Sequence, residues 1–310
     1  MTFAMVFPGQ GSQSVGMMAE LAQVSERVRE TFEEAGDAVH QDLWSLVCEG
    51  PEDELRLTAT TQPCMLAAGV ATWRVWREAG GPLPRRMAGH SLGEYTALVC
   101  AGVLDFAEAL RLVRCRGEFM QEAVPVGVGA MAAVLGLPAA QVQTLCAEAA
   151  HREILSVANF NAPTQTVIAG HVGAVDRAIE LAHKAGAKRA VRLPVSAPFH
   201  CRLMQPAADR LKPMIDAQAM AAPQVEVVNN VDVAVQQDPD AIRDALYRQI
   251  AAPVRWVELI ESMVVADIRT VIECGPGRVL AGINKRIDRM LELPAIDSAE
   301  SLEKALATVA

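Results

Sequence analysis

The sequence contains neither of two common metal-ligand spacings. No Cys-x-x-Cys and no His-Glu-x-x-His occurs among its 310 residues, so nothing in it indicates a zinc site, and we expect no metal. Paired cysteines are missing too. The seven cysteines are an odd number at scattered positions, which is typical of reduced thiols, and we therefore expect a cytoplasmic protein.

The sequence also lacks a positive charge balance, and we expect neither a leader nor a membrane span. The formal net charge of -9 argues against general nucleic-acid binding, which needs a concentrated basic surface. The N-terminus has no basic segment and reaches Pro8 too soon for the apolar region of a signal peptide. Residues 123–147 are uncharged, but Pro125 and Pro138 disqualify them as a membrane span. With 51% hydrophobic residues, the chain is expected to bury a large core.

The most informative motif is the pentapeptide Gly89-His90-Ser91-Leu92-Gly93. Gly-x-Ser-x-Gly allows a serine to sit on a sharp turn between a strand and a helix, where its hydroxyl is exposed. The flanking residues favour this arrangement, since 86–88 fit the end of a short buried strand and 92–102 fit a largely apolar helix. The same pentapeptide also occurs in ordinary glycine-rich turns, so by itself it leaves both interpretations open.

Strand and helix patterns alternate along the chain, as expected for a layered α/β protein. In the N-terminal part they predict a strand at 4–7 and helices at 24–39, 62–79, 92–102 and 106–122. From 126 to 195 they predict strand 130–135, helix 139–149, strands 154–160 and 165–169, helix 174–185 and strand 189–193. Further strands are predicted at 225–229 and 270–273, and a helix at 279–287.

The middle segment has the order β-α-β-β-α-β, which is that of a ferredoxin-like module. Because strands are predicted both before and after it, we interpret it as an insertion into a larger sheet. The predicted fold is α/β. An α/β-hydrolase-like large domain with a mostly parallel sheet comprises residues 1–125 and 197–310, and an inserted ferredoxin-like α+β subdomain comprises 126–196.

A nucleophilic serine needs a base, and His200 is the best placed of the six histidines. It lies after a predicted strand in the loop Leu193–Cys201, and catalytic groups concentrate on loops of a rigid scaffold. The alternative is a hydrogen-bonded loop histidine without a chemical role. His90 adjoins Ser91, but neighbours across such a turn usually point apart, so we expect His90 to be structural or to support the residues that contact the substrate. The other four histidines are expected to be solvated.

Two arginines, Arg114 and Arg116, lie in a predicted helix whose other faces are apolar. Arginine is a natural partner for a substrate carboxylate, because its planar fork binds both oxygens and stays charged when desolvated. If one of them is buried beside Ser91, the substrate is an acid. The alternative is a pair of arginines on a solvated helix face.

Several short motifs stand in order along nearly the whole chain. They are Phe7-Pro8-Gly9-Gln10-Gly11-Ser12-Gln13, Thr61-Gln62-Pro63, Gly89-His90-Ser91-Leu92-Gly93-Glu94-Tyr95, Arg116-Gly117 with Met120, Asn159-Phe160-Asn161, Pro198-Phe199-His200 and Glu273-Cys274-Gly275-Pro276-Gly277. In this combination the sequence resembles the malonyl-CoA:acyl carrier protein transacylase family of dissociated fatty acid synthesis. Cys201, where the family often has serine, is a neutral departure.

The resemblance assigns the covalent chemistry to two side chains. It implies that Ser91 is the acylated nucleophile and that His200 is its general base and later its acid. In the family a main-chain carbonyl, here that of Gln249, accepts the other imidazole proton and fixes the tautomer. This accounts for the absence of the acidic residue that an α/β-hydrolase would use.

The remaining site residues are implied in the same way. The amides of Gln10 and Leu92 would form the oxyanion hole. Arg116 would bind the malonyl carboxylate, with Gln62 nearby in the acyl pocket. Phe199 would narrow the pocket against branched acyl groups, as the equivalent residue does in malonyl-selective acyltransferase domains of polyketide synthases.

The implied reaction carries a malonyl group from malonyl-CoA to the pantetheine thiol of acyl carrier protein, without cofactor or metal, for fatty acid synthesis. Carrier proteins are acidic and so is this chain, so we expect a local basic rim at the cleft mouth, drawn from Lys188, Arg189, Arg202, Arg278, Lys285, Arg286 and Arg289. We expect a monomer. The alternatives are the same transfer for a polyketide or specialised pathway, a serine hydrolase, and a carrier-binding scaffold without activity.

Overall fold

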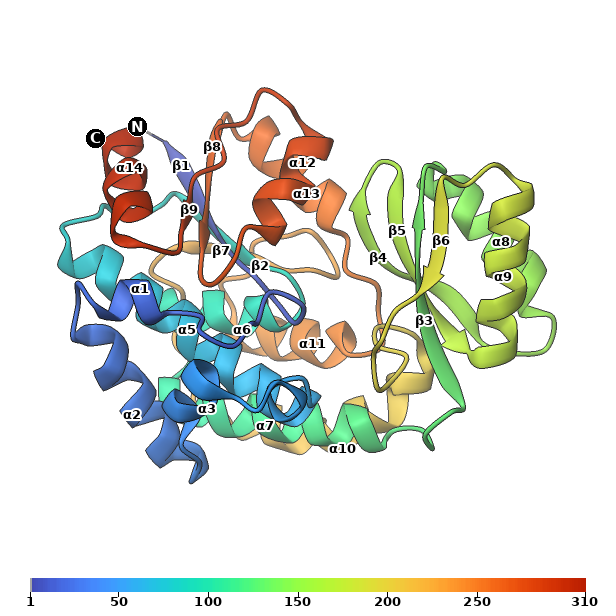
Figure 1. Ribbon diagram of the computed structural model, residues 1–310, viewed down its shortest axis with the longest axis horizontal. Helices are drawn as coiled ribbons and strands as arrows, with labels where there is room; N and C mark the ends of the chain where they lie inside the picture. Colours follow the sequence, from blue (N-terminus) through green and yellow to red (C-terminus); the bar gives the residue numbers. More distant parts are fainter. Residues whose placement is uncertain (1) are drawn as a thin grey trace.

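A computed structural model describes residues 2–310, which form two separate sheets flanked by helices (Figure 1). The strands are β1 (Phe3–Phe7), β2 (Arg86–Gly89), β3 (Gly129–Leu135), β4 (Leu155–Ala162), β5 (Gln165–His171), β6 (Arg189–Arg192), β7 (Glu226–Val228), β8 (Thr270–Cys274) and β9 (Ala295–Ile296). The helices are α1 (Ala19–Ala22), α2 (Arg27–Val39), α3 (Leu43–Glu49), α4 (Glu52–Leu55), α5 (Thr58–Glu78), α6 (Leu92–Cys100), α7 (Phe106–Glu122), α8 (Ala139–Ala150), α9 (Val172–Lys184), α10 (Gln205–Asp216), α11 (Pro239–Gln249), α12 (Trp256–Val265), α13 (Val279–Ile287) and α14 (Ala299–Val309).

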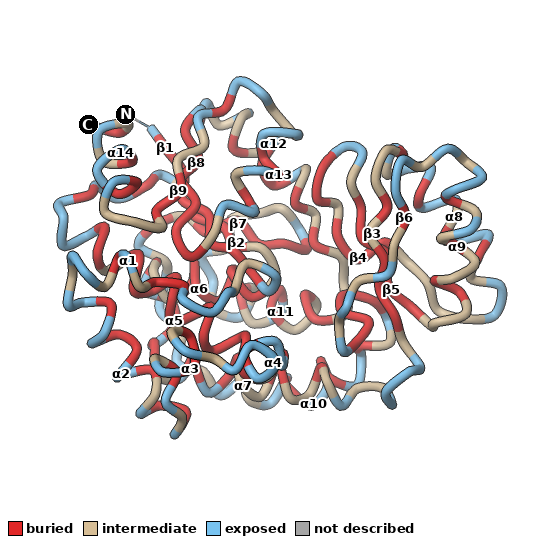
Figure 2. Tube along the Cα trace, in the orientation of Figure 1, coloured by how far each residue is buried: buried red, intermediate tan, exposed pale blue. Residues whose placement is uncertain are grey.

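The larger sheet is parallel throughout and has the strand order β7-β2-β1-β8-β9. Its central strand, β1, is apolar and buried along its whole length (Figure 2). Alternate side chains of β1 enter two different cores. Phe3, Met5 and Phe7 join the core that contains α2, α5 and α7, whereas Ala4 and Val6 join the core that contains α12 and α13. With both faces covered, ligand sites are expected at the carboxyl ends of the strands.

The smaller sheet has the order β4-β5-β3-β6, and all its pairs are antiparallel. Helices α8 and α9 cover one face, where Ala132 and Val134 of β3 pack with Val142 and Val175 of the two helices. The alternate residue Met131 belongs to the core of the larger unit instead. The order of elements and strands is ferredoxin-like, so the predicted fold class is confirmed.

Both ends of the chain build the larger sheet, because β1 and β2 precede the smaller sheet in sequence and β7, β8 and β9 follow it. The strands of the smaller sheet all lie between residues 129 and 192. On this basis we propose that residues 1–125 and 197–310 form one discontinuous domain and residues 126–196 the other.

Helix α5 is longer than predicted, because it begins at Thr58 rather than at residue 62. Its first turn packs closely against α7: a Cβ added to Gly117 would lie 2.6 Å from Ala59 Cα and 2.7 Å from Thr58 O. The contact with α7 stabilises this first turn of α5, which the local sequence alone does not predict. It also brings Gln62 on α5 within hydrogen-bond distance of Arg116 on α7.

Gly117→Ala is expected to lower the free energy of unfolding by about 1–3 kcal/mol, because the added methyl group meets backbone atoms that cannot move aside without separating the helices. The measurement is denaturant unfolding followed by circular dichroism. Gly282→Ala in α13 is the matched control, since an added Cβ there has no atom within 4 Å, and we expect no loss of stability. Equal effects of the two substitutions would contradict the close packing of α5 on α7.

Candidate active site

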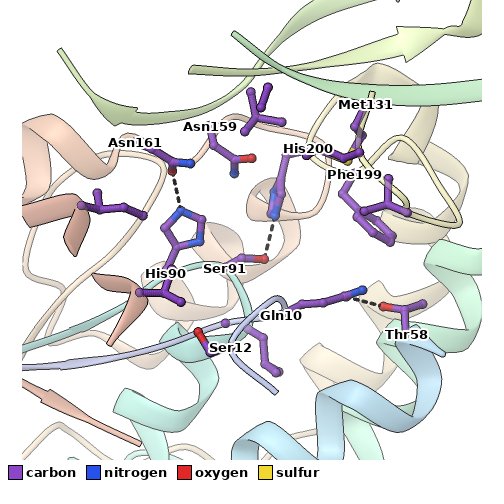
Figure 3. A pocket seen from close by; sticks show the side chains of 18 of the residues that line it. Gln10, Ser12, Thr58, His90, Ser91, Met131, Asn159, Asn161, Phe199 and His200 are labelled. Atoms are coloured by element: carbon purple, nitrogen blue, oxygen red, sulfur yellow. Dashed lines mark hydrogen bonds between the residues drawn. The ribbon is translucent and has the colours of Figure 1, made fainter. Parts of the chain in front are cut away.

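Ser91 lies on a sharp turn between the end of β2 and the start of α6, as the pentapeptide predicts. Its φ angle of 53° is in the left-handed region, which a serine adopts only where the surrounding structure imposes it. A Cβ on Gly89 would lie 1.7 Å from the carbonyl carbon of Gly93, and a Cβ on Gly93 would lie 2.1 Å from Phe7 O. The two glycines are therefore required for the turn, which presents Ser91 to a cavity (Figure 3).

His200 reaches the serine from the loop that precedes α10. Its Nε2 lies 2.6 Å from Ser91 Oγ, while its Nδ1 lies 3.0 Å from Gln249 O and 3.2 Å from Ala252 O. Because carbonyl oxygens only accept hydrogen bonds, Nδ1 carries the proton and Nε2 accepts from the serine hydroxyl. Burial, and then the charge of Arg116, lower the pKa of His200 to about 3, so the imidazole is neutral at neutral pH.

Arg116 is buried in α7, with 2% of its surface exposed. Its Nη1 donates to Gln62 Oε1 at 2.8 Å, and its Nη2 donates to Gln249 Oε1 at 3.0 Å and to Ser91 Oγ at 3.1 Å. Within residues 2–310 these partners are all neutral oxygen atoms, and Arg116 Nε has no partner. Arg114 is directed elsewhere, since its Nη1 donates to Val39 O at the end of α2 and its Nε pairs with Glu118 of the same helix. A buried guanidinium of this kind is suited to bind an anion.

Two residues that line the cavity with Ser91 have backbone amides without a partner in the described residues 2–310. Across residues 2–310, the amides of Gln10 and Leu92 donate to no other backbone or side-chain group, and both residues line the cavity that contains Ser91. The turn that carries Gln10 is held in place because Thr58 Oγ1 donates to Gln10 Oε1 at 2.8 Å (Figure 3). Free N–H groups beside a serine can stabilise the oxyanion formed when its hydroxyl attacks a carbonyl.

The cavity itself has a volume of about 300 Å³ and lies between the two sheet units. Met131 and Val167 of the smaller sheet line one side, and Leu280 and Ile283 of α13 line another. Phe199 adds its ring beside the catalytic candidate His200 (Figure 3). The cavity is therefore small, and polar and apolar side chains line it in roughly equal numbers, which suits a short acyl chain that carries a polar group.

His90 contacts Asn161 rather than the serine hydroxyl. Its Nε2 lies 2.9 Å from Asn161 Oδ1 (Figure 3). Its ring packs on Trp256 with 5.3 Å between ring centroids. Burial lowers the pKa of His90, so this ring is neutral too. His90 also lines the cavity that contains Ser91.

The sequence analysis missed two polar groups behind the turn. Asn230 Oδ1 accepts from Ser91 N at 2.8 Å, and Asn230 Nδ2 donates to Gly89 O at 2.7 Å. The Gln249 side chain, expected to act only through its main-chain carbonyl, donates from Nε2 to Ser91 O at 3.0 Å. The one signal for Asn230 was its place just after a predicted strand, because polar residues at the carboxyl ends of parallel strands gather at one edge of the sheet.

The described chain, residues 2–310, holds no group of three or more His, Cys, Asp or Glu side chains placed to bind a metal ion. Over the same residues, no helix combines the length and the apolar character needed to cross a membrane. The polar groups that line the cavity around Ser91 are imidazole, guanidinium, side-chain amide, hydroxyl and backbone groups. Such groups can move protons and stabilise oxyanions, which is the chemistry of acyl transfer.

Comparison with known proteins places this geometry among acyltransferases. Residues 4–304 match the family model of the acyl transferase domain. A Salmonella typhimurium protein named malonyl CoA-acyl carrier protein transacylase is 53% identical over 304 residues, which cover 98% of each chain. The structure of the malonyl CoA-acyl carrier protein transacylase from Coxiella burnetii is 50% identical, with a TM-score of 0.98 over 99% of this chain and 97% of that one.

A further similar structure contains two proteins. It is a malonyl-transacylase in complex with a type II PKS acyl-carrier protein, and its matching chain is 52% identical, with a TM-score of 0.98. The match covers 99% of this chain and 100% of that one. The similarity thus extends over the whole of both sheet units rather than over the serine turn alone.

Proposed function

This chain belongs to the acyl transferase family, and on that premise we propose that it moves the malonyl group of malonyl-CoA to the pantetheine thiol of acyl carrier protein, for fatty acid synthesis. The observation that carries the proposal is the position of Arg116. Within residues 2–310, this buried guanidinium has no carboxylate partner, and it lies 3.1 Å from Ser91 Oγ. It favours an acyl group that ends in a carboxylate, because the planar fork binds two oxygens at once.

The first step acylates Ser91. His200 Nε2 takes the hydroxyl proton while Ser91 Oγ attacks the thioester carbonyl of malonyl-CoA. The carbonyls of Gln249 and Ala252 hold the proton on His200 Nδ1, so that the ring presents its basic nitrogen and the imidazolium is stabilised as it forms. The amides of Gln10 and Leu92 bind the oxyanion. CoA then leaves as a thiol with the proton from His200, and the serine ester remains.

The second step reverses the first with another thiol. His200 Nε2 takes the proton from the pantetheine thiol, the sulfur attacks the ester, and Ser91 Oγ recovers the proton as the ester bond breaks. A thioester is exchanged for a thioester, so the overall step is nearly balanced. The apolar walls of the cavity keep water from the ester until the thiol arrives, and Phe199 leaves little room for a branched acyl group.

Binding of the carrier protein is assigned to a basic rim. All seven basic residues expected there are exposed: Lys188, Arg189, Arg202, Arg278, Lys285, Arg286 and Arg289. Helix α13 joins the rim to the site, because its Ile283 lines the cavity while Lys285 and Arg286 extend outward from its last turn. Arg286 also hydrogen-bonds Gln165, another cavity residue. A positive rim would steer an acidic carrier to the cavity mouth.

The remaining features of the proposal follow from the same site. We propose that side chains and backbone amides carry out the reaction alone, without a cofactor or a metal. A monomer suffices, because every group named above comes from one chain. The cytoplasm is the proposed compartment, consistent with seven free cysteines.

A transferase and a hydrolase differ in what happens when the carrier is left out. We expect malonyl-CoA alone to release a single burst of CoA equal to the enzyme present, because the ester forms and water does not remove it. Adding holo-acyl carrier protein should restore continuous release and produce malonyl carrier. The measurement is free thiol against time, with the carrier analysed by mass. Sustained release without carrier would identify a hydrolase, and no release at all would identify a scaffold.

A further inference from the structure

Glu94 is a carboxylate in the otherwise apolar helix α6, and it is only 2% exposed. Within residues 2–310, no arginine or lysine lies within ion-pair distance of it, and its hydrogen bonds come instead from two neutral donors. Burial raises the pKa of Glu94 to about 7, against the opposing effect of those hydrogen bonds. A buried acid of this kind costs stability, and the reaction steps described above do not use it.

The Gln249 amide connects Glu94 to the reacting groups. Gln249 Nε2 donates to Glu94 Oε2 at 2.9 Å and to Ser91 O at 3.0 Å. Gln249 Oε1 accepts from Arg116 Nη2 at 3.0 Å. If the amide rotated by half a turn, its NH2 group would face a guanidinium that only donates, and its oxygen would face two acceptors. The amide therefore has one orientation that satisfies every partner.

Asn230 gives Glu94 a second connection to the turn. The same carboxylate oxygen, Glu94 Oε2, accepts from Asn230 N at 2.9 Å. The Asn230 side chain bridges Ser91 N and Gly89 O, so the residue anchored by Glu94 also holds the strained backbone of the nucleophile. The same Glu94 oxygen therefore holds both Asn230 and Gln249, the two residues whose side chains hydrogen-bond the backbone of Ser91.

We propose that Glu94 is a positioning residue for malonyl transfer: its Oε2 fixes the direction of the Gln249 amide, which in turn holds the Arg116 guanidinium beside Ser91 Oγ. The inference rests on the proposed function. Gln249 separates the carboxylate from the guanidinium, so Arg116 stays near a negative group without forming an ion pair with it. Its fork is therefore already placed, and within residues 2–310 its partners are neutral oxygen atoms rather than a carboxylate that would compete with that of the substrate.

The required property is an acceptor oxygen at this position. Glu94→Leu removes the oxygen, leaves the Gln249 amide free to rotate and lets Arg116 move away from its place beside Ser91. We expect kcat/KM for malonyl transfer to fall by about tenfold or more relative to kcat/KM for acetyl transfer, because only malonyl uses Arg116. Glu94→Gln retains an acceptor oxygen of similar reach and should restore the malonyl-to-acetyl ratio of the parent enzyme.

The experiment measures kcat and KM for malonyl-CoA and acetyl-CoA, with holo-acyl carrier protein as acceptor, in the parent, Glu94→Leu and Glu94→Gln. Glu273→Leu is the matched control, because Glu273 is also buried and instead accepts from Leu280 N and Ala281 N at the start of α13. We expect it to lower the thermal midpoint without changing the malonyl-to-acetyl ratio. If Glu94→Leu does not fold, Gln249→Leu must show the same selective loss.

The outcomes separate this inference from the proposed function. A parent enzyme that transfers no malonyl group contradicts the proposed function itself. A parent enzyme that transfers malonyl, with Glu94→Leu or Gln249→Leu losing malonyl and acetyl transfer equally, overturns the positioning role alone. So does a Glu94→Gln enzyme with the same selective loss as Glu94→Leu, since the acceptor oxygen would then not be the property that matters.

Discussion

Ser91→Ala is expected to reduce malonyl transfer to the uncatalysed level, a loss of roughly 10⁴-fold or more, because the covalent route disappears with the hydroxyl. The surrounding structure should persist. The turn is held by Gly89, Gly93 and Asn230, none of which needs the serine side chain. The measurement is the initial rate of malonyl carrier formation from malonyl-CoA and holo-acyl carrier protein.

Ser12→Ala provides the comparison for this result. Ser12 is another serine that lines the cavity, but no hydrogen bond links it to His200 or Arg116 in the described residues 2–310. The Ser12 variant should still accept malonyl from malonyl-CoA as a covalent ester. Substantial transfer by the Ser91 variant, with an ester carried by another hydroxyl, would contradict the assignment of the nucleophile.

Arg116→Ala is expected to lower kcat/KM for malonyl transfer by about 10²–10³-fold, since the malonyl carboxylate would then enter the cavity without its cation. Acetyl transfer should fall far less, because an acetyl group presents no carboxylate. The charge of Arg116 is also the second cause, after burial, of the low pKa of His200. Its removal therefore raises the pKa of His200, which makes the imidazole a stronger base for either acyl group. The measurement is kcat/KM for both acyl-CoA donors with the same carrier.

Arg114→Ala is the matched control on the same helix. Its side chain is 37% exposed and binds Glu118 and Val39 O away from the cavity, so its removal should leave the ratio of malonyl to acetyl transfer unchanged. Parallel losses of malonyl and acetyl transfer in Arg116→Ala would remove the carboxylate-binding role. The acid specificity would then have to arise from another part of the cavity.

The sequence predicted those features that depend on residues close together in the chain, namely single turns, strands and helices. The glycines around Ser91 specify a turn whose backbone no larger residue permits, and the structure has that turn. Strand β1 reads as an apolar run and is buried, and helix α7 begins at Phe106 and ends at Glu122 as its apolar periodicity indicates. In the smaller unit, the alternation of strands and helices was enough to predict a ferredoxin-like order.

The features that were missed depend on contacts between distant segments. Strand β9 has two residues, Ala295–Ile296, and exists because it pairs with β8, so no local pattern announces it. Glu94 lies in an apolar helix, and a glutamate is normally solvated, so its burial depends on Asn230 and Gln249, which follow it by 136 and 155 residues. Family resemblance supplied the role of Arg116, whereas the pattern of residues left Arg114 and Arg116 equivalent.

The central claim is that the malonyl group passes through an ester on Ser91 Oγ. The most direct test is the mass of the peptide that contains Ser91 after brief exposure of the protein to malonyl-CoA, followed by addition of holo-acyl carrier protein. The account predicts a gain of one malonyl group on Ser91 that is lost when the carrier is added and reappears on the carrier. An unmodified Ser91 peptide during active transfer, or a modified one that the carrier cannot discharge, would contradict it.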